Sequence, residues 1–184
     1  MDYVYICRNG DNEELRYSIR SVVANGKPDN IWVVGGKPDW YRGNFIEVIQ
    51  DKDKYQNARN NMKTIAHSKD ISEHFVLMND DFFIINPINY VETFHGGSLS
   101  DKIGIFELHS NSSPYTKLLL KTEQVLNRWG ISDPLDYAIH VPMVMEKNKL
   151  KDIMNTRIEG ISIRTLYGNK FDIGGQLIKD EDTQ

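Results

Sequence analysis

The feature that most constrains the fold of this chain is the alternation of short apolar runs with stretches of helical periodicity. Apolar runs occur at 3–7, 31–34, 45–49 and 75–78. After the first and the third of them, apolar residues recur every three or four positions, the spacing of one helical face. Strands that alternate with helices build a mostly parallel sheet. We therefore expect an α/β fold, a single Rossmann-like domain over residues 1–178 with a mostly parallel sheet flanked by helices.

Local signals predict where several helices begin and end. Asp11 and Glu14 have the spacing of a capping box and predict the start of the first helix. A helical face between residues 118 and 129 is followed by Gly130, which is typical of a helix C-terminus. A further helix is expected at about 147–154. These signals extend the helical content into the second half of the chain.

The remaining segments are less regular. The run 82–85 is expected to extend as a short strand. The acidic residues from 179 to 184 are expected to form a flexible tail. No internal repeat and no low-complexity segment is found.

Composition makes some classes of protein less favoured without excluding a nucleic-acid partner. The net charge is −4, and no run of Lys and Arg resembles the basic stripe of a typical nucleic-acid binder. One cysteine cannot form an internal disulfide, which is typical of a reducing compartment. No apolar stretch approaches the length of a membrane span or of a signal-peptide core. We expect a cytoplasmic protein with no membrane span.

The sequence Met78-Asn79-Asp80-Asp81 carries the strongest chemical signal, because two carboxylates and an amide directly follow a buried apolar run. In open α/β sheets, ligands bind beyond the carboxyl ends of the strands. Adjacent carboxylates repel each other, and a divalent cation relieves that repulsion. Oxygen ligands favour Mg²⁺ or Mn²⁺, with substrate phosphates completing the shell. The alternative, a solvated turn, fits the spacing equally well.

Two segments together resemble the GT-A type of glycosyltransferase. Residues 55–61, Tyr-Gln-Asn-Ala-Arg-Asn-Asn, are similar to the Ala-Arg-Asn helix that precedes the metal-binding strand in that family. Residues 79–81 then resemble its Asp-x-Asp motif, with Asn79 in place of the first Asp. The resemblance implies Mn²⁺ or Mg²⁺ as cofactor, Asp81 as metal ligand, and Arg59, Asn79 and Asp80 as donor-binding residues.

The same resemblance draws attention to the loop after the first strand, which holds the nucleotide in GT-A domains. Arg8, Asn9 and Asp11 occupy it and are the expected nucleotide-binding residues. A guanidinium there can also bind a diphosphate through two hydrogen bonds. Asp11 has the alternative role of helix cap.

Three segments are similar to the Stealth family of sugar-phosphate transferases. They are 14–21, Glu-Leu-Arg-Tyr-Ser-Ile-Arg-Ser; 38–40, Pro-Asp-Trp; and 72–83, which runs from Ser through the two aspartates to Phe. The first strand and the length of the chain differ from that family. This resemblance implies a related fold, and it leaves open transfer of a sugar phosphate in place of a sugar.

The second half of the chain supplies further candidates. Asp133 and Asp136, with Glu107, are the carboxylates that can act as a catalytic base towards an acceptor hydroxyl. His140 precedes a Val-Pro pair, which resembles a late His-x-Pro element of Stealth-like transferases and implies a metal or phosphate contact. Arg164 is followed by Gly168 in a segment that either folds over the donor diphosphate or forms a plain surface turn.

Together these patterns predict a metal-dependent glycosyltransferase that moves a sugar from a nucleotide-sugar, with a UDP-sugar as the expected donor. The acceptor is expected to be a glycan, a protein or a modified DNA base. Two alternatives remain open. One is a Stealth-like sugar-1-phosphate transferase, and the other is a non-catalytic domain that binds a nucleotide or carbohydrate.

Overall fold

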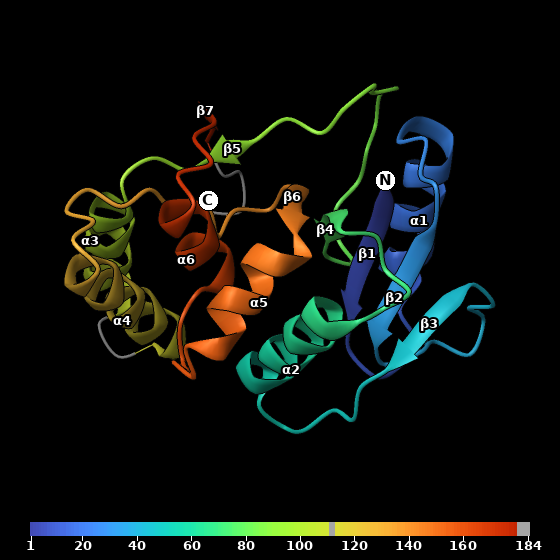
Figure 1. Ribbon diagram of the computed structural model, residues 1–184, viewed down its shortest axis with the longest axis horizontal. Coiled ribbons are helices and arrows are strands. Elements are labelled where there is room, and N and C mark those ends of the chain that lie inside the picture. Colours follow the sequence, from blue (N-terminus) through green and yellow to red (C-terminus); the bar gives the residue numbers. More distant parts are fainter. Residues whose placement is uncertain (111–112, 180–184) are drawn as a thin grey trace. The chain divides into compact units, whose positions relative to one another are not determined.

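The computed structural model describes residues 1–110 and 113–179 and shows an α/β protein (Figure 1). The chain forms two compact units. The first contains residues 1–92 and 141–154, and the second contains residues 93–140 and 155–184. Residues 1–178, expected as one domain, are thus divided between both. Of the expected tail, residues 180–184 lie outside the described residues.

The first unit is built on a five-stranded sheet in the order β3-β2-β1-β4-β6. Its strands are β1 (Asp2–Cys7), β2 (Ile31–Gly35), β3 (Asn44–Glu47), β4 (His74–Met78) and β6 (Met143–Glu146). The first four are parallel, and β6 pairs antiparallel with β4 at the edge. Its helices are α1 (Glu13–Asn25), α2 (Lys54–His67) and α5 (Lys147–Asn155). The expected α/β class, with a mostly parallel sheet flanked by helices, is confirmed.

The two faces of this sheet are covered by different helices. Strand β1 lies between β2 and β4. The crossover through α1 leads from β1 to β2, and the crossover through α2 leads from β3 to β4, so the two run in opposite directions along the sheet. Because parallel crossovers are right-handed, α1 and α2 cover opposite faces (Figure 1). On the α1 face, the hydroxyl groups of Tyr5 and Ser18 are 2.9 Å apart.

A continuous apolar core fills the α1 face of the sheet. Side chains of a strand alternate between the two faces, so every second residue of β1 points to this side. The buried members of the core are Tyr3, Tyr5, Cys7, Leu15, Val22, Val33, Tyr41, Val76, Met78, Phe82 and Ile84. Phe82 and Ile84 come from the segment just beyond β4. The core therefore includes the chain that follows the two aspartates.

The second unit is mainly helical. It contains α3 (Leu99–Ser110), α4 (Pro114–Arg128) and α6 (Ile163–Lys170), with a two-stranded sheet of β5 (Phe94–His95) and β7 (Gln176–Leu177). Gly130 ends α4 as expected: it has φ +84°, and Ile131 N donates to Leu126 O, which closes a Schellman motif.

Two expectations for local structure are wrong. Residues 82–85 form no strand, because their backbone groups bond to side chains of α1 and not to a neighbouring strand. The segment around Arg164 is the helix α6 and not a turn; Ser162 caps it, and Gly168 lies inside it. Glycine is required there because a Cβ at Gly168 would lie 2.3 Å from the ring of Tyr137.

None of the helices within residues 1–110 and 113–179 has both the length and the apolar character needed to cross a membrane.

Candidate functional site

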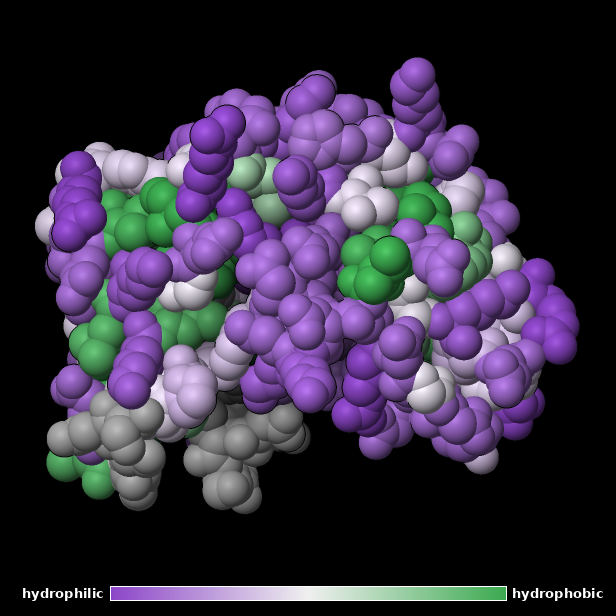
Figure 2. All heavy atoms as spheres, turned by 90° about the horizontal axis from the view of Figure 1, so that it is seen from below, coloured by the Kyte–Doolittle hydropathy of each residue, from purple (hydrophilic) through white to green (hydrophobic). Residues whose placement is uncertain are grey.

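The candidate site lies at the sheet edge where β1 and β4 end. These two strands are adjacent, and the crossover through α1 runs from β1 to β2 on one side while the crossover through α2 runs from β3 to β4 in the opposite direction. Such a reversal of strand order opens a crevice at the carboxyl ends of the strands, the usual ligand site of open α/β sheets. Figure 2 views the molecule from the side towards which β1 and β2 point in Figure 1, and hydrophilic residues predominate over the first unit there.

A cleft of about 460 Å³ opens at this edge. Its lining combines cationic, carboxylate and carboxamide side chains with the ends of β1 and β4. The lining residues are Ile6, Cys7, Arg8, Glu14, Gln50, Lys54, Asn57, Ala58, Asn61, Asn79, Asp80 and Asp81. The structure thus places Asn79, Asp80, Asp81 and Arg8 around one cleft, as expected from the sequence.

Asp80 is held by a side chain that the sequence analysis missed. Asn12 caps α1: its Oδ1 accepts from Leu15 N at 3.0 Å, and its Nδ2 donates to Asp80 Oδ2 at 2.5 Å. The cap expected at Asp11 is therefore wrong by one residue, and Asp11 is exposed. An asparagine directly before a helical run is itself a capping signal. Only the contact with Asp80 lay beyond sequence reasoning.

Cys7 lies close to this pair at the end of β1. Asn12 Nδ2 is 3.9 Å from Cys7 Sγ. Burial and then the nearby charge of Asp80 raise the pKa of the Cys7 thiol to about 11, and the Asn12 contact opposes this only in part. The thiol is therefore protonated at neutral pH and contributes no charge to the cleft.

Further polar side chains of α1 hold the chain that follows Asp81. Ser18 Oγ donates to Phe82 O, and Tyr5 supplies a hydroxyl to Ser18 in turn. Ser21 Oγ accepts from Ile84 N at 3.0 Å, and Asn25 Nδ2 donates to Ile84 O at 2.5 Å. These contacts fix a segment that has no strand partner, directly beyond the two aspartates.

The opposite wall of the cleft comes from α2 and the loop before it. Asn57 Nδ2 donates to Asp51 O at 2.7 Å, and Asp51 N donates back to Asn57 Oδ1 at 2.7 Å. Gln50 Nε2 donates to Asn61 Oδ1 at 3.2 Å and to Val48 O. Asn61 is thus bonded to Gln50 directly, and Asn57 is joined to them only through the backbone of Asp51, so the loop before α2 connects the three carboxamides. Sequence reasoning singled out this helix for Arg59 and missed Asn57 and Asn61 as lining residues.

Arg59 is directed elsewhere. Its Nη2 donates to Met154 O, at the end of α5, at 3.4 Å. Arg59 is not among the residues that line the cleft; the lining residues from α2 are Lys54, Asn57, Ala58 and Asn61. The contact with Met154 joins Arg59 to the end of α5 in the first unit. The donor-binding role implied by the resemblance stays a prediction.

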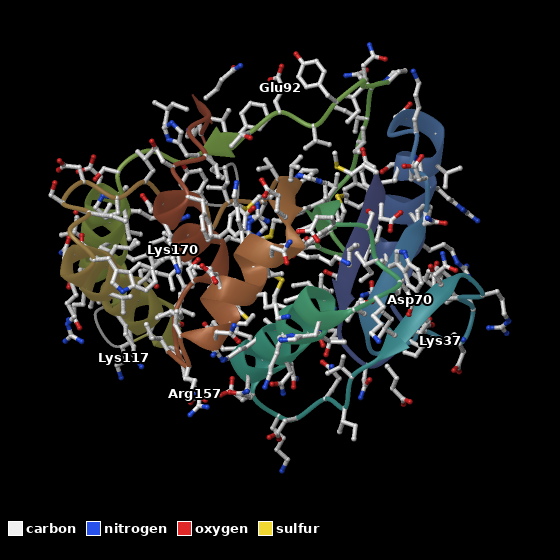
Figure 3. All side chains as sticks on the ribbon, viewed as in Figure 1. Lys37, Asp70, Glu92, Lys117, Arg157 and Lys170 are labelled. Atoms are coloured by element: carbon white, nitrogen blue, oxygen red, sulfur yellow. The ribbon has the colours of Figure 1, made fainter. Side chains whose placement is uncertain are left out.

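The polar residues of the loop after β1 line three different hollows. Arg8 lines the main cleft, and with Asn9 it also lines a neighbouring hollow of about 500 Å³ formed with residues 50–52 and Asn57. Asp11 lines a different hollow of about 430 Å³ with Arg16, Trp40 and Lys37, the last of which is labelled in Figure 3. Arg8 therefore shares the main cleft with Asp80 and Asp81, whereas, of these three hollows, Asn9 lines only the neighbouring one and Asp11 lines the third.

Asp136 has the surroundings of a structural residue in the second unit. Its side chain is fully buried, and Lys102 Nζ lies 2.6 Å from Oδ2. Its Oδ1 accepts from Ala138 N at 2.9 Å and from Thr165 Oγ1 at 3.3 Å. A carboxylate that is buried and bonded in this way has no access to an acceptor hydroxyl. The expected role of Asp136 as a catalytic base finds no support.

The other predicted residues of the second half also lie in the second unit. Asp133 and His140 are both exposed. Arg164 Nε donates to Tyr137 O at 3.0 Å, which connects α6 with the loop between α4 and β6. The cleft described above is formed by residues of the first unit, so these three residues take no part in it. Their proposed roles stay predictions.

The oxygen donors of the cleft suit a hard divalent cation. Asp80 and Asp81 supply carboxylates and Asn79 an amide, the ligand types that Mg²⁺ and Mn²⁺ accept. Among the described residues, no group of three or more His, Cys, Asp or Glu side chains could hold a metal ion. Two carboxylates suffice where substrate phosphates and water complete the coordination shell.

Comparison of the chain with protein-family models finds no match, and comparison with curated proteins finds no relative.

Proposed function

We propose that the cleft at the ends of β1 and β4 binds a nucleoside-diphosphate sugar with Mn²⁺ or Mg²⁺, and that the protein transfers the sugar to an acceptor hydroxyl. The observation that carries this proposal is the convergence of Asp80 and Asp81 with Arg8 at the topological switch point of the sheet. The resemblance of residues 55–61 and 79–81 to GT-A glycosyltransferases points to the same chemistry.

The charge of the cleft explains why a divalent cation is needed. Its lining contains two cations, Arg8 and Lys54, and three carboxylates, Glu14, Asp80 and Asp81. The lining therefore carries one net negative charge, which repels a diphosphate group. A divalent cation reverses this balance, and it neutralises charge on a leaving diphosphate when it is bound. We therefore expect donor binding to depend on the metal.

The remaining polar groups of the cleft suit the rest of the donor. The Arg8 guanidinium can bind phosphate oxygens through two hydrogen bonds, and Lys54 can add a point charge. The connected carboxamides of Gln50, Asn57 and Asn61 provide donors and acceptors for ribose, base or sugar hydroxyls. This division assigns the diphosphate to Arg8, Lys54 and the cation, and the neutral parts of the donor to the carboxamides of the opposite wall.

The reaction is a substitution at the anomeric carbon. An acceptor hydroxyl oxygen forms the new bond, the bond to the diphosphate oxygen breaks, and the nucleoside diphosphate leaves with the electron pair. The hydroxyl proton passes to a general base. A glycan, a protein or a modified DNA base remain the expected acceptors.

The test is donor binding, measured as a thermal shift with UDP, GDP and CDP and their sugars, with and without Mn²⁺. A donor at a hundred times its Kd stabilises the folded state by about 2.7 kcal/mol. We expect one donor to stabilise the wild type only when Mn²⁺ is present. We also expect Asp81→Ala to remove this stabilisation.

The matched control is Asp70→Ala, which removes an exposed carboxylate ahead of β4 with the same change in net charge; Asp70 is labelled in Figure 3. This variant should keep metal-dependent donor binding. Stabilisation by no donor, or full binding by Asp81→Ala, would refute the proposal. Release of a nucleoside monophosphate would indicate transfer of a sugar phosphate, and binding without turnover would indicate a non-catalytic domain.

A further inference from the structure

We infer that Asn12 is a positioning residue for the cation-binding carboxylates: it holds Asp80 in place while it caps α1. This inference rests on the proposed function, because it concerns the same carboxylate pair. It adds a residue from a different part of the chain, 68 positions before Asp80 in the sequence.

The side chain of Asn12 is fixed at both ends. It is 3% exposed, its Oδ1 accepts the cap hydrogen bond from Leu15 N, and its Nδ2 donates to Asp80 Oδ2. The carboxamide is planar, so directing Oδ1 towards the helix directs Nδ2 away from it. Asp80 therefore receives a donor whose direction is set by the first turn of α1.

The residue type matches this double task. Asn, Asp, Ser and Thr all cap helices well. Asparagine alone among them carries an acceptor and a donor on opposite arms of one planar group. Aspartate at position 12 would place a second negative charge beside Asp80, and serine would lose the donating arm. The cap thus supplies a neutral donor to a carboxylate that has a like-charged neighbour, Asp81.

The consequence for the site is a fixed carboxylate orientation. With one hydrogen bond to Oδ2 supplied by Asn12, Oδ1 and the second lone pair of Oδ2 are left to bind a cation. Groups that hydrogen-bond to ligating carboxylates set their orientation, and loss of such groups typically costs 10–100-fold in metal affinity. The bonds from Ser18, Ser21 and Asn25 to the chain beyond Asp81 fix the backbone of the same segment but touch neither carboxylate.

The test compares Mn²⁺ affinity, measured by electron paramagnetic resonance of free Mn²⁺, in the full chain and its variants. Asn12→Ser keeps a capping oxygen and removes the amide arm that reaches Asp80. Ser21→Ala is the control, because it removes another α1 side chain that holds the same segment at Ile84. Asn12→Thr is a second cap-competent variant in case the serine variant does not fold. Thermal unfolding is measured in parallel.

We expect Asn12→Ser to bind Mn²⁺ about tenfold more weakly than the wild type, while Ser21→Ala binds it unchanged. The inference is overturned if a folded Asn12 variant binds Mn²⁺ with unchanged affinity while Asp81→Ala abolishes Mn²⁺ binding. That result leaves the proposed function intact. Equal weakening in both variants also overturns it, because a general loosening of the segment then accounts for the loss. No Mn²⁺ binding by the wild type, even with UDP present to complete the coordination shell, overturns both proposals.

Discussion

The buried ion pair of Lys102 with Asp136 gives a quantitative prediction about stability. The two charged atoms are 2.6 Å apart, with side chains that are 10% and 0% exposed. Removing one partner of a buried pair typically costs 3–5 kcal/mol, because the other charge stays buried without compensation. We therefore expect Lys102→Met to lower the free energy of unfolding of the second unit by about 3–5 kcal/mol.

The chain contains a control of matched geometry. Lys149 and Glu146 are also 2.6 Å apart, but their side chains are 37% and 34% exposed. An exposed pair contributes about 0.2–1 kcal/mol. Both variants, Lys102→Met and Lys149→Met, lose one positive charge, so their difference isolates burial. Urea denaturation followed by circular dichroism measures both, and an equal loss in the two variants would refute the reasoning.

Three further outcomes are expected. Gly168→Ala should destabilise the protein by about 1–3 kcal/mol, since its Cβ would lie 2.3 Å from the ring of Tyr137. Gly104→Ala has open space around the new Cβ and should stabilise α3 by about 0.5–1 kcal/mol. Thermal unfolding that ranks the two variants in the opposite order would contradict this. Native Cys7 should react with iodoacetamide far more slowly at pH 8 than in urea, because its raised pKa of about 11 keeps it protonated, and equal rates would count against the assignment. Burial raises the pKa of Asp2, but the hydrogen bonds that Asp2 accepts lower it by more, so its net pKa lies below the ordinary value. The stability advantage of the wild type over Asp2→Asn should be full at neutral pH and should vanish as the pH falls through that lowered pKa. A stability difference in urea denaturation that does not depend on pH would contradict this.

The parts of the fold that were predictable are those with local causes. The strand that ends at Met78 is a continuous apolar run, and polar residues follow it at once, so both the strand and the position of Asp80 and Asp81 at its carboxyl end could be read directly. Gly130 marks the end of α4 through its own backbone conformation. Each of these features depends on residues close together in the sequence.

The parts that were missed depend on residues far apart in the sequence. The segment of helix α6 resembles a turn in sequence because glycine is unfavourable inside helices. The glycine at position 168 is explained by the ring of Tyr137, which leaves no space for a Cβ. The run 82–85 has the composition of a strand, but its hydrogen-bonding groups are taken by α1. Arg59 faces Met154 because α5 packs near it. No local pattern encodes these partners.

The way in which α1 holds the chain beyond Asp81 also orders the events of folding. Asn12 bonds to Asp80, Ser18 to Phe82 and Asn25 to Ile84, across separations of 68, 64 and 59 residues. Closing such long loops delays contact formation. During synthesis, α1 can therefore form early, but it must wait for the ribosome to deliver the fourth strand before the aspartates acquire their final geometry. A chain of residues 1–70 alone lacks the fourth strand and both aspartates, so the polar side chains of α1 have none of these partners and the binding site is absent.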